Sequence, residues 1–185
     1  MSFLCRIYSG IFALIQRIAG DWFLGLGARL VFASVLAGYF LNSAMTKVGS
    51  GFPGFFLPSD GAYVQIMPKV MESVGYDVSQ ISFIPYGLIV MAGTYAEFIL
   101  PVLVVIGLLT RFSALAMIGF IMVQTFVDIN FHGLDAKSIG APFDRIQDSI
   151  VADQRLLWLF PLVYLVIRGA GALSFDHLFW GKKEK

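Results

Sequence analysis

A single glutamate lies in the most apolar stretch of this chain. Glu97 is part of the sequence TYAEFILPVLVVIGLLTR, which runs from residue 94 to residue 111. A carboxylate in the interior of a membrane is costly unless it is paired, protonated or hydrated. A residue of this kind can bind a polar group or transfer a proton, and it can also simply hold helices in register. The sequence leaves both interpretations open.

Three more polar side chains are candidates for a site with Glu97. Arg29 is the nearest charged residue on another apolar segment, and Gln124 lies at about the depth of Glu97, roughly 20 Å from the inner end. Arg111 shares a helical face with Glu97. We therefore predict an intramembrane polar site, in which Arg29 pairs with Glu97 and Gln124 donates a hydrogen bond to it. The residues of this site are Arg29, Glu97, Arg111 and Gln124.

A second polar cluster is expected where the apolar segments meet the outer surface. Its members are Lys47, Asp128, His132 and Asp153. These side chains could form a polar mouth above the bundle. The chain has only two histidines, and an Asp-x-Asn-x-His spacing is a weak metal-ligand pattern, so we predict no metal site.

The composition shows why polar residues in the apolar segments require an explanation. Hydrophobic residues make up 58% of the 185, charged residues only 14%, and the mean hydropathy is +0.80. Soluble domains carry about 25% charge, so the natural solvent of this chain is a lipid bilayer. The net charge of +1 argues against a nucleic-acid partner. One cysteine, Cys5, excludes an internal disulfide or a CxxC redox pair.

Four apolar segments are long enough to predict membrane spans, since a spanning helix needs about 20 residues. They are 22–45, 81–110, a third that starts at Phe112 and a fourth that starts at Leu156. We predict an all-α integral membrane four-helix bundle. An ordered outer loop and an N-terminal amphipathic helix complete this fold. The expected divisions are an interfacial helix at 1–20, a four-span domain at 21–180 and a basic cytoplasmic tail at 181–185.

Basic residues set the expected orientation. Arg6, Arg17, Arg111 and the lysines of the tail fall on the side that bears both termini. Positive residues concentrate on the cytoplasmic side of membrane proteins, so both termini are expected to be cytoplasmic. In the first 20 residues, apolar side chains gather on one helical face and Arg6 and Arg17 on the other. That pattern predicts a helix on the inner membrane surface, with packing against the bundle as the alternative.

Several segments together resemble the DoxX family of small four-span bacterial membrane proteins. They are ARL (28–30), MTK (45–47), AEFILPVLVVIGLLTRFSALAM (96–117) and GAGALSFDHL (169–178). The resemblance implies a multi-pass protein of the bacterial inner (plasma) membrane that is associated with redox systems. Some relatives are subunits of a thiosulfate:quinone oxidoreductase. The family's charged intramembrane residues correspond here to Arg29, Lys47, Glu97 and Arg111.

Two classes of function follow. In the first, the protein is a membrane subunit or anchor of a redox-associated system, with a soluble or membrane redox partner and a quinone or thiol-related ligand in the bundle. In the second, it is a non-enzymatic membrane protein that handles a small solute or a metal. The sequence does not identify the ligand, the oligomeric state or whether the protein is an enzyme.

Overall fold

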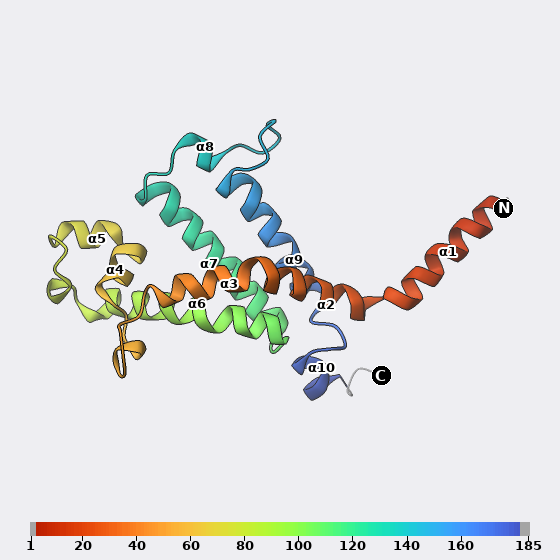
Figure 1. The fold of residues 1–185 in the computed structure, drawn as a ribbon, viewed down its shortest axis with the longest axis horizontal. Helices are drawn as coiled ribbons and strands as arrows, with labels where there is room; N and C mark the ends of the chain where they lie inside the picture. The colour runs from red at the N-terminus through yellow and green to blue at the C-terminus, as the bar shows by residue number, and fades with distance from the viewer. Residues whose placement is uncertain (1–2, 182–185) are drawn as a thin grey trace.

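The computed structural model describes residues 3–181, and within that range the chain is helical with no strand (Figure 1). The helices are, in chain order, α1 (Phe3–Ala19), α2 (Asp21–Phe32), α3 (Gly38–Met45), α4 (Asp60–Ile66), α5 (Pro68–Ser73), α6 (Leu88–Ile106), α7 (Thr110–Phe131), α8 (Ala136–Ile139), α9 (Arg155–Arg168) and α10 (Phe175–Trp180). The all-α prediction is therefore confirmed. The basic tail predicted at 181–185 falls, apart from Gly181, outside the described residues.

Four helical segments in the described range are long and apolar enough to cross a membrane. They are Trp22–Met45, Phe83–Ile106, Thr110–Phe131 and Ile150–Arg168. The first joins α2 to α3 through a π-helical turn, and the second and fourth open with π-helical turns before α6 and α9. The fourth span begins six residues earlier than the expected Leu156, because a π-helical turn at Ile150–Gln154 extends α9 toward the outer loop.

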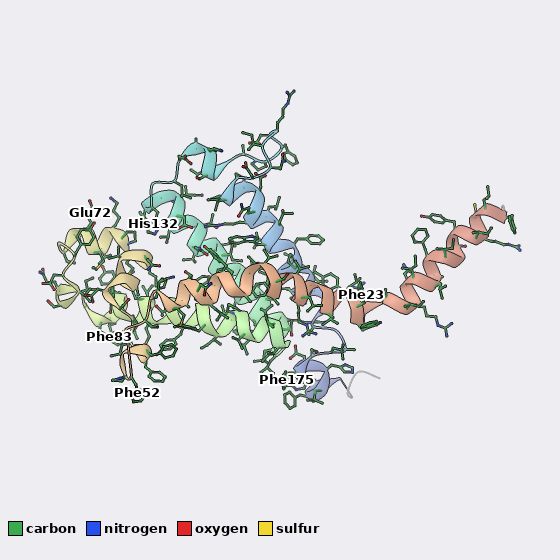
Figure 2. The ribbon with its side chains drawn as sticks, in the orientation of Figure 1. Phe23, Phe52, Glu72, Phe83, His132 and Phe175 are labelled. Carbon is green, nitrogen blue, oxygen red and sulfur yellow. The ribbon has the colours of Figure 1, made fainter. Side chains whose placement is uncertain are left out.

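The four spans form one bundle. Span one packs against α6 through α3 and against α9 through α2, while α7 packs against both α6 and α9. The core consists of buried apolar side chains from spans one to four: Phe32, Leu36, Phe40, Val104, Ala114, Met117, Ile121, Leu162 and Leu165. Most of the outward-facing side chains are also apolar, among them Phe23 and Phe83, which are more than half exposed (Figure 2). A surface of this kind suits contact with lipid.

Glycine allows two chain segments to meet at the end of the bundle that carries the termini. A Cβ atom on Gly25 would lie 2.7 Å from backbone atoms of Ala170 and Gly171. A Cβ on Gly27 would meet nothing within 4 Å. The close approach of span one to the turn after α9 therefore depends on Gly25.

The loop between spans one and two folds into a cap at the opposite end. It contains α4 and α5, and α4 packs against α6. The Tyr95 hydroxyl donates a hydrogen bond of 2.7 Å to the Phe56 carbonyl, which fastens the loop to span two. The loop is ordered, as the sequence predicted, and its position on the outer side remains a prediction.

The N-terminal helix α1 projects away from the bundle (Figure 1). None of its residues is buried in this chain. Phe3, Leu4 and Ile11 are each more than half exposed, and Ile7 and Phe12 are more than 40% exposed. The alternative in which α1 packs against its own bundle is thus wrong, and its placement on a membrane surface remains a prediction.

Candidate functional site

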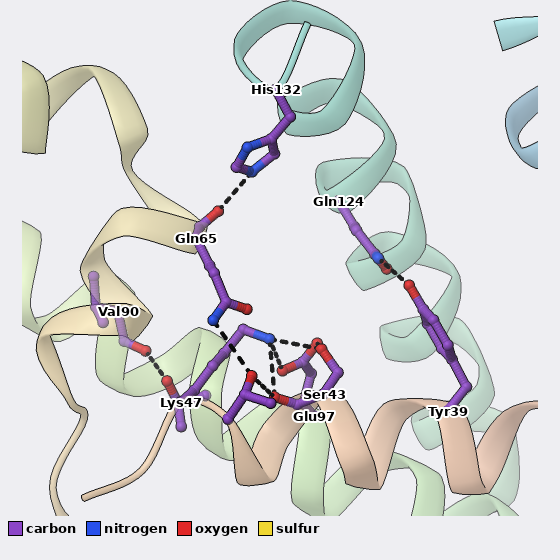
Figure 3. A network of polar contacts seen from close by, with 10 residues as sticks. Tyr39, Ser43, Lys47, Gln65, Val90, Glu97, Gln124 and His132 are labelled. Carbon is purple, nitrogen blue, oxygen red and sulfur yellow. Dashed lines mark hydrogen bonds and ion pairs between the residues drawn. The ribbon is translucent and has the colours of Figure 1, made fainter. Parts of the chain in front are cut away.

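The buried carboxylate of Glu97 pairs with Lys47. Lys47 Nζ lies 2.7 Å from Glu97 Oε2, and the two side chains are 7% and 3% exposed. Ser43 lies between them: its hydroxyl accepts a hydrogen bond from Lys47 Nζ at 2.7 Å and donates one to Glu97 Oε1 at 3.1 Å (Figure 3). Ser43 and Lys47 are four residues apart, so the lysine stem folds back along one helical turn to reach the glutamate.

The predicted pairing of Arg29 with Glu97 is wrong. Arg29 precedes Ser43 by about 14 residues, which is roughly 20 Å along a helix. The prediction measures the depth of Glu97 from the end of span two that carries Arg111. Glu97 instead faces the last turns of span one, close to the outer loop, while Arg29 lies near the opposite end.

Arg29 has a separate role at that opposite end. Its guanidinium group donates to the backbone carbonyls of Val105 and Ala170, each at 3.1 Å, and to that of Leu173. The last carbonyls of a helix have no partner within the helix, and Arg29 satisfies that of Val105 together with two in the segment after α9. The residue therefore connects span one to the ends of spans two and four.

Asp176 completes this arrangement and is not among the predicted site residues. Its carboxylate accepts hydrogen bonds from the backbone N–H groups of Leu109 at 2.6 Å and Thr110 at 2.8 Å, which caps the start of α7. Its own N–H donates to the Gly107 carbonyl at 2.8 Å. The only sequence signal for this contact was that the segments GLLTR and SFDHL occur together in the resemblance to the DoxX family. We call Arg29, Asp176 and the backbone groups that they bind the inner lock.

Gln124 does not contact Glu97, contrary to the prediction. Its side-chain amide nitrogen donates to the Tyr39 hydroxyl at 3.0 Å (Figure 3). The Tyr39 ring lies 5.4 Å from that of Trp158, and the Arg155 guanidinium lies 6.0 Å from the same indole. Arg155 also forms an ion pair with Asp128, one helical turn after Gln124. These five residues link spans one, three and four, and we call them the Tyr39–Arg155 cluster.

The cluster contains polar atoms that the described residues 3–181 leave unsatisfied. Arg155 is 4% exposed, and its Nε and Nη1 groups are buried without a hydrogen-bond partner there. Gln124 Oε1 is also buried without a hydrogen-bond partner there. A buried polar group without a partner costs about 1–3 kcal/mol, so these atoms indicate a place for a further polar molecule. Only Gln124 and Asp128 of this cluster were among the predicted site residues.

The four residues of the predicted outer mouth do not form one site. Lys47 joins Glu97, and Asp128 joins Arg155. His132 Nε2 lies 3.0 Å from the Gln65 carbonyl oxygen on α4 (Figure 3), and the Asp153 carboxylate accepts from the N–H and hydroxyl of Ser149. These side chains separate because each span finds its own loop or helix partner. Within residues 3–181, no three potential metal ligands come together.

Carboxylates in the loops that follow spans one and three are held in their charged form by local hydrogen bonds. At Asp135, which precedes α8, hydrogen bonds from the side chain and backbone of Ser138 lower the pKa of the carboxyl. At Asp77, hydrogen bonds from Ser79 and Gln80 also lower the pKa. These groups stabilise loop turns and lie apart from the intramembrane residues.

Arg111, the last predicted member of the intramembrane site, also lies away from Glu97. It follows the turn between α6 and α7, at the end of the bundle where the inner lock lies. There it lines an open pocket together with Arg168. The four predicted residues therefore belong to three different places in the bundle.

Comparison with known proteins agrees with this architecture. The family model described as DoxX matches residues 24–129, more than half of the chain. The chain belongs to the DoxX family. The match includes Arg29, Lys47, Glu97 and Gln124 of this DoxX protein and ends before α9. No curated protein and no solved structure matches the chain.

Proposed function

We propose that this DoxX protein is a membrane subunit of a redox-associated system and binds a quinone headgroup at the Tyr39–Arg155 cluster. The observation that supports the proposal is the unsatisfied set of polar atoms beside two aromatic rings. Arg155 Nε and Nη1 are donors, and Gln124 Oε1 is an acceptor. The rings of Tyr39 and Trp158 flank them. Plasma-membrane location with cytoplasmic termini, and a soluble or membrane redox partner, are part of the same proposal.

The residues of the cluster fit such a headgroup chemically. A quinone has carbonyl oxygens that accept hydrogen bonds, and its reduced form has hydroxyl groups that donate them. The N–H groups of Arg155 suit the former and Gln124 Oε1 suits the latter. The aromatic side chains provide flat apolar contact. When bound, a quinone supplies two-electron, two-proton redox chemistry, and the partner protein supplies the electrons.

The Lys47–Glu97 pair would serve this function as a nearby acid–base group. Ser43 is four residues after Tyr39 on α3, so the ion pair lies one helical turn from the cluster. A polar route connects the pair with the outer cap: the Gln65 amide donates to Thr46 Oγ1 at 3.3 Å, and His132 contacts the Gln65 carbonyl. In this proposal Glu97 exchanges protons with the outer side. An ion pair that served only to join helices could be replaced by uncharged hydrogen-bonding residues at a lower desolvation cost.

Tryptophan fluorescence tests the proposal directly. The chain has three tryptophans, and only Trp158 belongs to the cluster; Trp22 and Trp180 lie at the other end of the bundle. The protein in lipid nanodiscs is titrated with decylubiquinone and with menadione. We expect saturable quenching that disappears in Trp158→Phe. Gln124→Leu should weaken binding about tenfold, since a hydrogen bond contributes roughly 1 kcal/mol or more.

Gln154→Leu is the matched control, because Gln154 is an exposed glutamine on span four, the span that carries Trp158. It should bind both quinones as the parent does. Quenching that rises linearly with quinone and is equal in the parent and Trp158→Phe would show partition into lipid alone. That result would contradict the proposal and favour the non-enzymatic alternative.

A further inference from the structure

An open pocket lies at the end of the bundle that carries the chain termini. Its volume is about 780 Å³, within the range of small-molecule sites. The wall is formed by the start of α7, the end of α9, the first turn of span one and α10. We call it the terminal pocket. It belongs neither to the Tyr39–Arg155 cluster nor to the Lys47–Glu97 pair, so an inference about it goes beyond the proposed function.

Two arginines give the terminal pocket a positive charge. Arg111 comes from the first turn of α7 and Arg168 from the last residue of α9. Both belong to the wall, and Arg111 Nε lies 3.6 Å from the position that a Cβ on Gly169 would take, beside Arg168. The one carboxylate in the described wall is that of Asp176, and its two oxygens accept the N–H groups of Leu109 and Thr110.

A buried hydroxyl provides an independent indication of a ligand. Thr110 is part of the wall and is fully buried, and its Oγ1 has no hydrogen-bond partner among residues 3–181. Thr110 is also the first residue of α7, a helix of 22 residues. The Asp176 carboxylate already caps the N-terminus of this helix. An oxyanion in this pocket would therefore find two guanidinium groups and the hydroxyl of Thr110.

The remaining wall suits a lipid. Trp22, Phe112 and Trp180 contribute large apolar or amphipathic side chains, each more than 40% exposed. Trp22 begins span one, Phe112 lies in the first turn of span three, and α10 follows span four. Tryptophan is enriched at membrane–water interfaces, and basic pockets between span ends bind anionic headgroups. A ligand here would have its charge at the headgroup level and its apolar part beside the spans.

We propose that the terminal pocket binds the phosphate of an anionic phospholipid. Arg111 and Arg168 contact the phosphate oxygens, and Thr110 is available to donate a hydrogen bond. The chains of the lipid lie along the exposed apolar faces of spans one and three. The phosphate of a lipid and free phosphate share the same oxygen chemistry, so the experiment must separate them.

Native mass spectrometry in detergent measures lipid retention by the intact protein. The protein is equilibrated with equal amounts of phosphatidylglycerol and phosphatidylcholine, and the occupancy of each is titrated. We expect preferential retention of phosphatidylglycerol. Arg111→Gln and Arg168→Gln should each raise its apparent Kd about tenfold or more, because a hydrogen bond from a charged group is lost. Arg111→Lys, which keeps the charge, should retain most of the binding.

Arg145→Gln is the matched control: Arg145 is an exposed arginine of the loop before span four. It should leave the Kd unchanged. Each variant must also have the same thermal midpoint as the parent without added lipid. If Arg168→Gln lowers that midpoint, the comparison of Arg111→Gln with the parent is used alone. Equal retention of both lipids, or equal weakening by Arg145→Gln, would overturn the proposal. Displacement of phosphatidylglycerol by millimolar inorganic phosphate would also overturn it, since the pocket would then select phosphate without the lipid.

Discussion

Lys47 Nζ lies 2.7 Å from Glu97 Oε2, and both side chains are almost completely buried between α3 and α6. Removal of one member leaves the other charge buried and unpaired, which typically costs about 3–5 kcal/mol. We therefore expect Glu97→Leu and Lys47→Met each to reduce the folded fraction in detergent strongly. The double variant should recover part of the loss, because neither charge then remains alone.

The control for this cycle is the combination of Glu97→Leu with Arg29→Met. Arg29 binds the inner lock and not Glu97, so the two losses should add. The free energy of unfolding, measured by reversible denaturation in mixed micelles, distinguishes the two cases. Recovery of stability in the Arg29 combination and not in the Lys47 combination would contradict the pairing.

The inner lock leads to the second prediction. Asp176→Asn keeps the size of the side chain but weakens the two hydrogen bonds that cap α7. Loss of a helix cap costs about 0.5–2 kcal/mol, and a similar decrease in unfolding free energy is expected here. Arg29→Met should cost more, because three carbonyls lose their donor. Asp148→Asn, at an exposed loop position, is the matched control and should leave stability unchanged.

The third prediction concerns the close approach of span one to the turn after α9. Gly25→Ala places a Cβ atom 2.7 Å from the backbone of Ala170, so the segments must separate. Overpacking of this kind costs about 1–3 kcal/mol. Gly27→Ala adds the same group where nothing lies within 4 Å and should be neutral or slightly stabilising. Equal thermal midpoints for the two variants would show that the contact at Gly25 is not tight.

The spans were predictable because hydropathy over about 20 residues depends only on the composition of each segment. The partner of Glu97 was harder to predict, because it depends on which end of span two faces which end of span one. The sequence shows that Ser43 and Lys47 share one helical face of span one. If the depth of Glu97 is measured from the correct end of span two, this face indicates the Lys47–Glu97 pair. Arg155 could not be assigned in this way, since its partner Asp128 lies on a different span and its contact with the Trp158 ring is one that no sequence pattern indicates.

The fourth prediction follows from Asp135, whose pKa is lowered by the hydrogen bonds from Ser138. A carboxyl with a lower pKa in the folded state adds stability that is complete above its unfolded pKa. That contribution is lost as the pH falls through the folded pKa. Protection of the α8 amides, measured as the exchange rate relative to the intrinsic rate at each pH, should therefore decrease only in the acidic range. Asp135→Asn should abolish this acidic dependence; an unaltered pH profile in that variant would mean that another group is responsible.

The last prediction concerns orientation, for which the single cysteine of the chain provides the probe. Cys5 is exposed on α1, and Phe143 is fully exposed in the loop between spans three and four. Three spans, an odd number, separate α1 from this loop and place the two on opposite sides of the membrane. The distribution of arginine and lysine favours a cytoplasmic α1. A membrane-impermeant maleimide should therefore label Cys5 in inverted vesicles and not in intact spheroplasts. Phe143→Cys in a Cys5→Ser background should give the reverse pattern. Labelling of both positions from the same side would contradict the four-span topology, while an exchange of the two patterns would keep the four spans and reverse their orientation.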